Sequence, residues 1–178
     1  MKASFAIHSL QRMLLFVHIL VFGGGYVVLY HSEANEMIEL RENVLDTDTY
    51  LMLRAQVGWK TLSRNQADKS VANCLYNLVA YEDGVPVGMG RVVGDGAVVC
   101  YIQDLVVIPS SRRKNIGGSI LDGLRNYVIS ITEPGTTMML CLMCAKGREK
   151  FYLDHGFTAR PTDNLGPGMI TYLDRPAD

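Results

Sequence analysis

Apolar and polar residues repeat along the chain with two different periods, which together predict a mixed α/β domain. Alternation with a period of two indicates half-buried strands, whereas apolar residues three and four positions apart indicate amphipathic helices. The predicted strands cover residues 38–42, 76–81, 87–93, 98–108, 137–144, 157–160 and 169–173, and the predicted helices cover 47–57, 63–74, 120–128 and 146–155.

Short polar residues and glycines mark where several of these elements begin and end. Asp46 or Thr47 can cap the first helix, and Thr61 or Ser63 can cap the second, because their side-chain oxygens accept hydrogen bonds from free helix N–H groups. Residues 83–84, Asp-Gly, are a strong signal for a two-residue hairpin between the second and third strands.

The segment from Tyr101 to Leu121 carries the strongest chemical signal in the chain. An apolar strand closed by Pro109 leads into a loop rich in cations and glycine, residues 112–118, and then into the third helix. A helix start offers unpaired N–H groups and a partial positive charge, and glycine lets an anion approach the backbone closely. The segment therefore predicts a pyrophosphate site, although an ordinary strand-to-helix connection with solvated cations is the plain alternative.

Two motifs resemble those of the GNAT superfamily of acyl-CoA-dependent N-acetyltransferases. Residues 112–117, RRKNIG, resemble its motif Q/R-x-x-G-x-G/A, with Asn115 where the family usually has glycine. Asparagine tolerates left-handed backbone angles better than most residues, so the turn can be kept. Residues 151–157, FYLDHGF, resemble the family's FYxxxGF motif, and the likeness extends from about Ile38 to Tyr172.

This resemblance implies a fold, a donor and the residues that bind it. The fold would be α/β (α+β), with a mixed central sheet of about six or seven strands, four helices and splayed central strands. Acetyl-CoA would be the acyl-donor substrate. Its implied contacts are Leu105, Val106, Val107, Arg112, Arg113, Lys114, Asn115, Ile116, Gly117, Gly118 and Ser119.

The resemblance also implies direct attack of a primary amine on the thioester, with Tyr152 as general acid. A phenol can give its proton to a thiolate of similar basicity, although a packed helix aromatic is the alternative for this residue. By the period of two, Tyr101 and Gln103 should lie on one face of the central strand and Asp104 on the other. The base is then water relayed to Asp104, Tyr101 or solvent, unless Asp104 only supports the strand. Trp59 is either a wall of the acceptor pocket or a cover of the core.

The sequence alone leaves open which amine is the acceptor and whether the protein catalyses the transfer at all. Residues 102–107, IQDLVV, resemble eukaryotic glucosamine-phosphate N-acetyltransferases, while the longer likeness is to plant serotonin N-acetyltransferases and bacterial relatives. Both favour a small-molecule amine. The alternatives are a GNAT-fold module that senses acyl-CoA without turnover and a membrane-tethered enzyme, and a homodimer is left open.

Composition narrows the class of protein. The chain has 178 residues, 20% of them charged, and a formal charge of −1, which suits one globular domain and argues against a nucleic-acid binder. Four cysteines are few for a secreted disulfide framework. Cys141 and Cys144 should point to opposite faces of a strand, so neither a redox pair nor a metal site is expected.

The N-terminal segment conflicts with the rest of this interpretation. Residues 13–32 contain no Asp, Glu, Lys or Arg, which is typical of a membrane span. Lys2 and Arg12 precede this segment and Glu33 and Glu36 follow it, so the positive-inside rule would place the domain outside the cell. Export with cleavage near 32–34 is a second hypothesis, and an extension upstream of a start at Met37 is the third. We therefore expect a hydrophobic extension at 1–36 and a cytoplasmic acetyltransferase domain at 37–178, with membrane contact only through 13–32.

Overall fold

The computed structural model describes the backbone of residues 16–22, 25–31 and 37–173 and the side chains of residues 37–173. The chain forms two compact units, one ending at Leu142 and one beginning at Met143. The elements of the first unit are β1 (Phe16–Phe22), β2 (Gly25–His31), β3 (Met37–Glu42), α1 (Thr47–Gln56), α2 (Arg64–Ala72), β4 (Tyr76–Glu82), β5 (Val85–Gly94), β6 (Val99–Val107), η1 (Pro109–Ser111), α3 (Ile116–Ile131) and β7 (Met139–Cys141). The second unit contains α4 (Glu149–Asp154).

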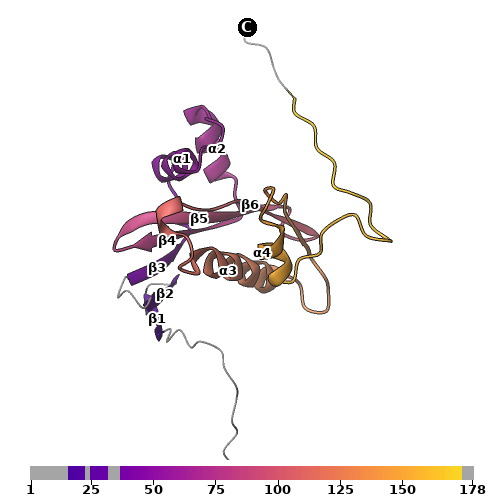
Figure 1. The fold of residues 1–178 in the computed structure, drawn as a ribbon. Coiled ribbons are helices and arrows are strands. Elements are labelled where there is room, and N and C mark those ends of the chain that lie inside the picture. The colour runs from indigo at the N-terminus through magenta and orange to yellow at the C-terminus, as the bar shows by residue number, and fades with distance from the viewer. Residues whose placement is uncertain (1–15, 23–24, 32–36, 174–178) are drawn as a thin grey trace, which may run out of the picture. The chain divides into compact units, whose positions relative to one another are not determined.

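One mixed sheet organises the first unit, and its strands follow the chain order from β1 to β7. Neighbouring strands are antiparallel from β1 to β6, and β7 is parallel to β6. The helices α1 and α2 lie on one face of this sheet and α3 lies on the other (Figure 1). The predicted mixed sheet with four helices is confirmed, and five of its seven strands, β3 to β7, belong to the predicted acetyltransferase domain.

Local sequence signals fix the ends of several elements as predicted. The carboxylate of Asp46 accepts a hydrogen bond from the Thr49 N–H and caps α1. Ser63 caps α2 in a reciprocal capping box with Gln66. The two turn residues at 83–84 both have positive φ, which is the requirement of the hairpin turn that their Asp-Gly sequence predicts.

The core forms on both faces of β4, β5 and β6. On the α3 face, a Cβ added to Gly90 of β5 would lie 2.8 Å from side-chain atoms of both Ile120 and Leu124, so glycine is what lets the helix pack this closely. On the α1 face, Tyr50 and Leu53 pack with Met89 in a buried cluster. Both helices are thereby held against the strands that carry the candidate site.

Two predicted strands do not form. Residues 157–160 and 169–173, which belong to the second unit, have no strand structure. Their apolar and β-branched residues favour strands, but a strand also needs a neighbouring strand to hydrogen-bond with, and local sequence does not supply one. The predicted strand at 137–144 is likewise shorter in the structure, where β7 spans only Met139–Cys141.

The second unit is built around α4 and the aromatic residues beside it. The Tyr152 ring makes edge contacts with Phe151 and Phe157, with ring centroids 5.0 and 5.9 Å apart. The Phe157 N–H donates to the Tyr152 carbonyl at 3.0 Å, which closes the turn after the helix. The FYLDHGF motif is therefore a compact helix end held by its own aromatic residues.

The apolar N-terminal segment contributes the strands β1 and β2, which extend the sheet beyond β3. In the ranges 16–22, 25–31 and 37–173, no helix is long and apolar enough to cross a membrane. The suggested cleavage site at 32–34 and the boundary at 36 lie outside the described residues, so the division into 1–36 and 37–178 stays a prediction.

Candidate functional site

The strand β6 loses its outer partner halfway along its length. It pairs with β7 only from Val99 to Tyr101, and among the described residues no other strand pairs with this edge as far as Val107. The Ile108 N–H donates to the Val87 carbonyl on β5, so the N–H and C=O of Val107 point to the opposite, open edge. The predicted splayed strands thus expose backbone donors and acceptors beside the end of β6.

A β-bulge at Asp104 interrupts β6 at the same place. The register with β5 shifts between Met89 and Arg91, and Asp104 has a positive φ of 59°. The extra residue breaks the period of two, so the side chain of Gln103 reaches the Asp104 carboxylate at 3.1 Å. The prediction that Gln103 and Asp104 occupy opposite faces of the strand is therefore wrong.

The Asp104 carboxylate accepts hydrogen bonds from several buried side chains. Its Oδ2 accepts from the Tyr50 hydroxyl at 2.7 Å and from Nη2 and Nε of Arg91 at 2.6 and 3.1 Å. Its Oδ1 accepts from Nη1 of Arg54 at 2.7 Å. Burial, and then the bond to Asp104, raise the pKa of Tyr50. This cluster ties α1 to β5 and β6 at the bulge.

A cavity of about 390 Å³ lies beside this cluster, which is within the usual size range of small-molecule sites. Helices α1 and α2 and strands β5 and β6 contribute its walls. The polar residues in its lining are Tyr50, Arg54, Ser70, Asn73, Arg91 and Gln103. Because Gln103 also lies where β6 leaves β7, the cavity and the open strand edge meet at this residue.

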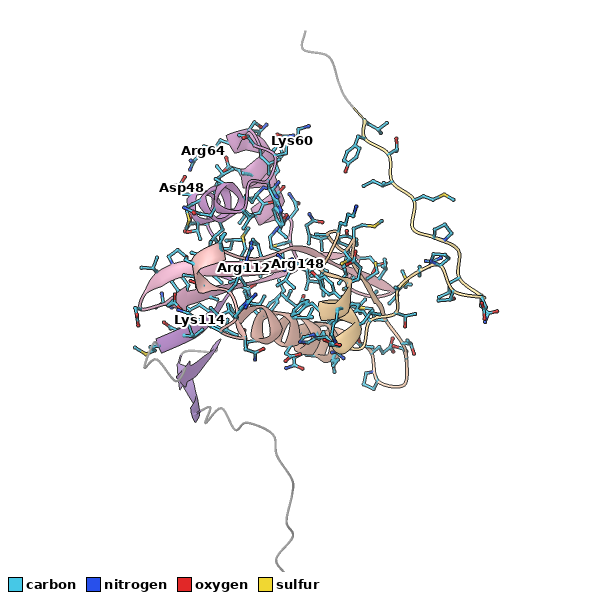
Figure 2. All side chains as sticks on the ribbon, in the orientation of Figure 1. Asp48, Lys60, Arg64, Arg112, Lys114 and Arg148 are labelled. Carbon is cyan, nitrogen blue, oxygen red and sulfur yellow. The ribbon has the colours of Figure 1, made fainter. Side chains whose placement is uncertain are left out.

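The connection between β6 and α3 carries the predicted pyrophosphate loop (Figure 2). Arg112 is exposed, and its Nε donates to the Val107 carbonyl on the open edge of β6. Lys114 is instead paired with Glu82 of β4 at 2.8 Å, and Ser111 donates to the same carboxylate. Burial alone would raise the pKa of Glu82, but these two partners outweigh it and lower that pKa. Lys114 therefore anchors the loop as well as adding charge.

The N-terminus of α3 is open to a ligand. Its cap residue Asn115 has a left-handed conformation with φ of 59°, as the motif requires, and its side chain makes no capping hydrogen bond. The first bond of the helix runs from the Ser119 N–H to the Asn115 carbonyl. The N–H groups of residues 116–118 thus have no carbonyl partner within the helix, which is the arrangement that binds anions.

Comparison with known proteins agrees with this geometry. The model of the acetyltransferase (GNAT) domain family matches residues 73–159, from β4 through the loop and α3 to the FYLDHGF motif. A probable acetyltransferase of unknown function from meticillin-resistant Staphylococcus aureus is 26% identical, with a TM-score of 0.67 over 77% of this chain and 100% of that one. Residues 73–159 of this chain therefore form an acetyltransferase domain of the GNAT family.

Two further solved structures are similar to this chain. A GNAT-family acetyltransferase from Streptococcus pneumoniae is 25% identical, with a TM-score of 0.66 over 79% of this chain and all of that chain. An aminoglycoside N-acetyltransferase determined in complex with CoA is 15% identical, with a TM-score of 0.58 over 79% of this chain and 96% of that one, and it shows the fold alone. No curated protein matches the chain.

The remaining predicted site residues, Trp59, Tyr101 and Tyr152, lie outside the cavity lining. Trp59 follows α1, packs on the core cluster and lies 5.1 Å from the Arg54 guanidinium, but it is not among the residues that line the cavity. Tyr101 is half-buried at the last position where β6 pairs with β7. Tyr152 lies in the second unit and is described above. Their proposed roles stay predictions.

Sequence reasoning missed three residues that shape the site: Arg54, Arg91 and Glu82. A signal existed for Arg91, because an arginine within the apolar run 87–93 of a central strand must find a partner when it is buried. Arg54 and Glu82 carry no such local signal. Their partners, Asp104 and Lys114, lie far away in the sequence.

Proposed function

We propose that the protein transfers an acetyl group from acetyl-CoA to the primary amine of a small molecule. The observation that carries this proposal is the continuity of the open edge of β6 with the uncapped N-terminus of α3 through a loop containing Arg112 and Arg113. An extended chain ending in a pyrophosphate fits such a path, because the open strand edge offers backbone donors and acceptors and the helix start offers N–H donors and positive charge.

The donor contacts follow from this path. The backbone of Leu105–Val107 would hydrogen-bond the pantetheine arm, and the amides of residues 116–119 would receive the pyrophosphate. Arg112 and Arg113 add charge at the surface of the loop, where both are exposed. Arg112 would exchange its bond with the Val107 carbonyl for one with phosphate. The aminoglycoside N-acetyltransferase that shares this fold was determined with CoA, which supports the same donor here.

In the proposed reaction the neutral amine attacks the thioester carbon, the C–S bond breaks, and the CoA thiolate takes a proton. Tyr152 is the proposed proton donor, on the strength of its residue type and its place in the FYLDHGF motif. Asp104 is poorly suited to be the base, because its oxygens already accept bonds from Tyr50, Arg54, Arg91 and Gln103. We propose that the amine proton leaves through water, at the end of the cavity where Gln103 lies.

Calorimetric titration with CoA tests the donor site. Arg112→Ala should weaken CoA binding by about 1–3 kcal/mol, the range for charge-assisted hydrogen bonds. The matched control is Arg64→Ala, since Arg64 is exposed on α2 and pairs with the exposed Asp48, away from the loop. Equal affinities of wild type and both variants would contradict the proposed donor site.

Binding alone does not separate an enzyme from an acyl-CoA sensor. Release of free CoA thiol in the presence of an amine does, because a sensor would bind acetyl-CoA and return it unchanged. A titration that shows CoA binding, followed by an amine panel that yields no thiol, would leave the fold assignment intact and replace the enzyme with a sensor.

A further inference from the structure

The buried cluster beside the cavity carries an excess of positive charge. Arg54 and Arg91 contribute two guanidiniums and Asp104 contributes one carboxylate, so two positive charges less one negative leave a net charge of +1. Within residues 37–173, Asp104 is the only carboxylate paired with either arginine. Side-chain exposures are 13% for Arg54, 5% for Arg91 and 1% for Asp104. A buried charge without a counter-charge is costly, so the cluster favours an anion.

The two arginines differ in how far their donors are used. Arg91 employs all three nitrogens, two toward Asp104 and one toward the Ser70 carbonyl of α2. Arg54 uses Nη1 for Asp104 and one hydrogen of Nη2 for the Lys60 carbonyl, at 3.3 Å. Its Nε is buried and has no hydrogen-bond partner. Arg54 lines the cavity and therefore keeps an unused Nε–H donor, which a carboxylate or phosphate bound there would satisfy.

We propose that the acetyl acceptor is a primary amine that also bears an anionic group, a carboxylate or a phosphate, and that Arg54 binds this group in the cavity. This inference rests on the proposed function. The anion neutralises the net charge of the cluster, and the amine end of the molecule reaches the open edge of β6 at Gln103. A cationic aminoglycoside or a simple arylalkylamine carries no such group and leaves the excess charge in place.

The first test compares pairs of amines that differ only in the anionic group. Phenylalanine is set against phenethylamine for a carboxylate, and glucosamine 6-phosphate against glucosamine for a phosphate, with kanamycin as the cationic acceptor. Thiol release should give a kcat/KM roughly 10- to 100-fold higher for the anionic member of at least one pair, which also tells carboxylate from phosphate. Equal or better use of phenethylamine, glucosamine or kanamycin, which lack the anionic group, would overturn the inference.

The second test assigns the preference to Arg54. Arg54→Gln should raise KM for the preferred amine by roughly 10- to 100-fold and should change KM little for the member of the pair that lacks the anionic group. Arg64→Gln is the matched control and should preserve the preference. Arg54→Lys keeps the charge opposite Asp104 but loses the planar fork, so it should lose a smaller part of the preference and serves if the glutamine variant does not fold. Equal losses for both members of the pair would overturn the role of Arg54.

A binding measurement keeps this inference separate from the proposed function. The thermal midpoint of the wild type should rise with millimolar glucosamine 6-phosphate or phenylalanine, and the rise should vanish in Arg54→Gln. Such a rise without thiol release would retain the anion site and reject the enzyme. Thiol release without any anion preference would retain the enzyme and reject the anion site.

Discussion

The substitution Asp104→Asn tests whether the carboxylate at the bulge is structural. Asparagine keeps the size of the side chain but removes its charge, which leaves Arg54 and Arg91 buried with no counter-charge. Removing one partner of a buried ion pair costs roughly 3–5 kcal/mol, and here one carboxylate serves two guanidiniums. We expect a loss in this range, which lowers the thermal midpoint by about 6–20 °C for a chain of this size.

The sole tryptophan makes this loss easy to measure. Trp59 packs on the core cluster and faces the Arg54 guanidinium, so its fluorescence during urea unfolding reports on this region. Asp122→Asn is the matched control, because Asp122 is exposed on α3 and its substitution should change stability by less than about 0.5 kcal/mol. A loss below about 1 kcal/mol in Asp104→Asn would refute the structural role. Unchanged stability with abolished turnover would instead make Asp104 the catalytic base.

Three further predictions concern the loop and the general acid. Gly117→Val should weaken CoA binding more than Arg112→Ala does, because its side chain blocks approach to the α3 amides, and calorimetry would show the reverse order if the helix start is not the site. Tyr152→Phe should preserve folding and CoA affinity but lower kcat by roughly 10²–10⁴-fold, and near-normal turnover in a stable variant would exclude the acid role. Because its partners lower the folded-state pKa of Glu82 below the ordinary value of 4.5, wild type should be more stable than Glu82→Gln at neutral pH. That advantage should shrink as the pH falls below about 4.5 through the folded-state pKa, and an advantage independent of pH in urea titrations would contradict the pairing with Lys114.

The features that could be predicted from sequence are those decided by neighbouring residues. The caps at Asp46 and Ser63, the hairpin turn at 83–84 and the left-handed Asn115 each depend on residues within one turn of the chain. The two GNAT motifs have the same local character. For this reason the element order from β3 to α3 and the location of the loop could be predicted from the sequence, whereas the strands β1 and β2 were not predicted.

The features that could not be predicted depend on partners distant in sequence. The bulge at Asp104 brings its carboxylate to Tyr50 and Arg54, about fifty residues earlier, and periodicity cannot register such a pairing. The predicted strands at 157–160 and 169–173 do not form for the same reason, since residue type alone does not supply a partner strand. The apolar segment at 13–32 could be a membrane helix or strands by composition alone, and pairing with β3 distinguishes them.

The most direct test of the central claim is a single stoichiometric measurement on the full-length protein. Purified protein is incubated with acetyl-CoA and each amine of the panel, and free CoA thiol and N-acetylated amine are quantified in the same reaction. We expect equal amounts of thiol and N-acetylated product for at least one primary amine, and neither without protein. Tight CoA binding without product for any amine, or thiol release without an acetylated amine, would contradict it.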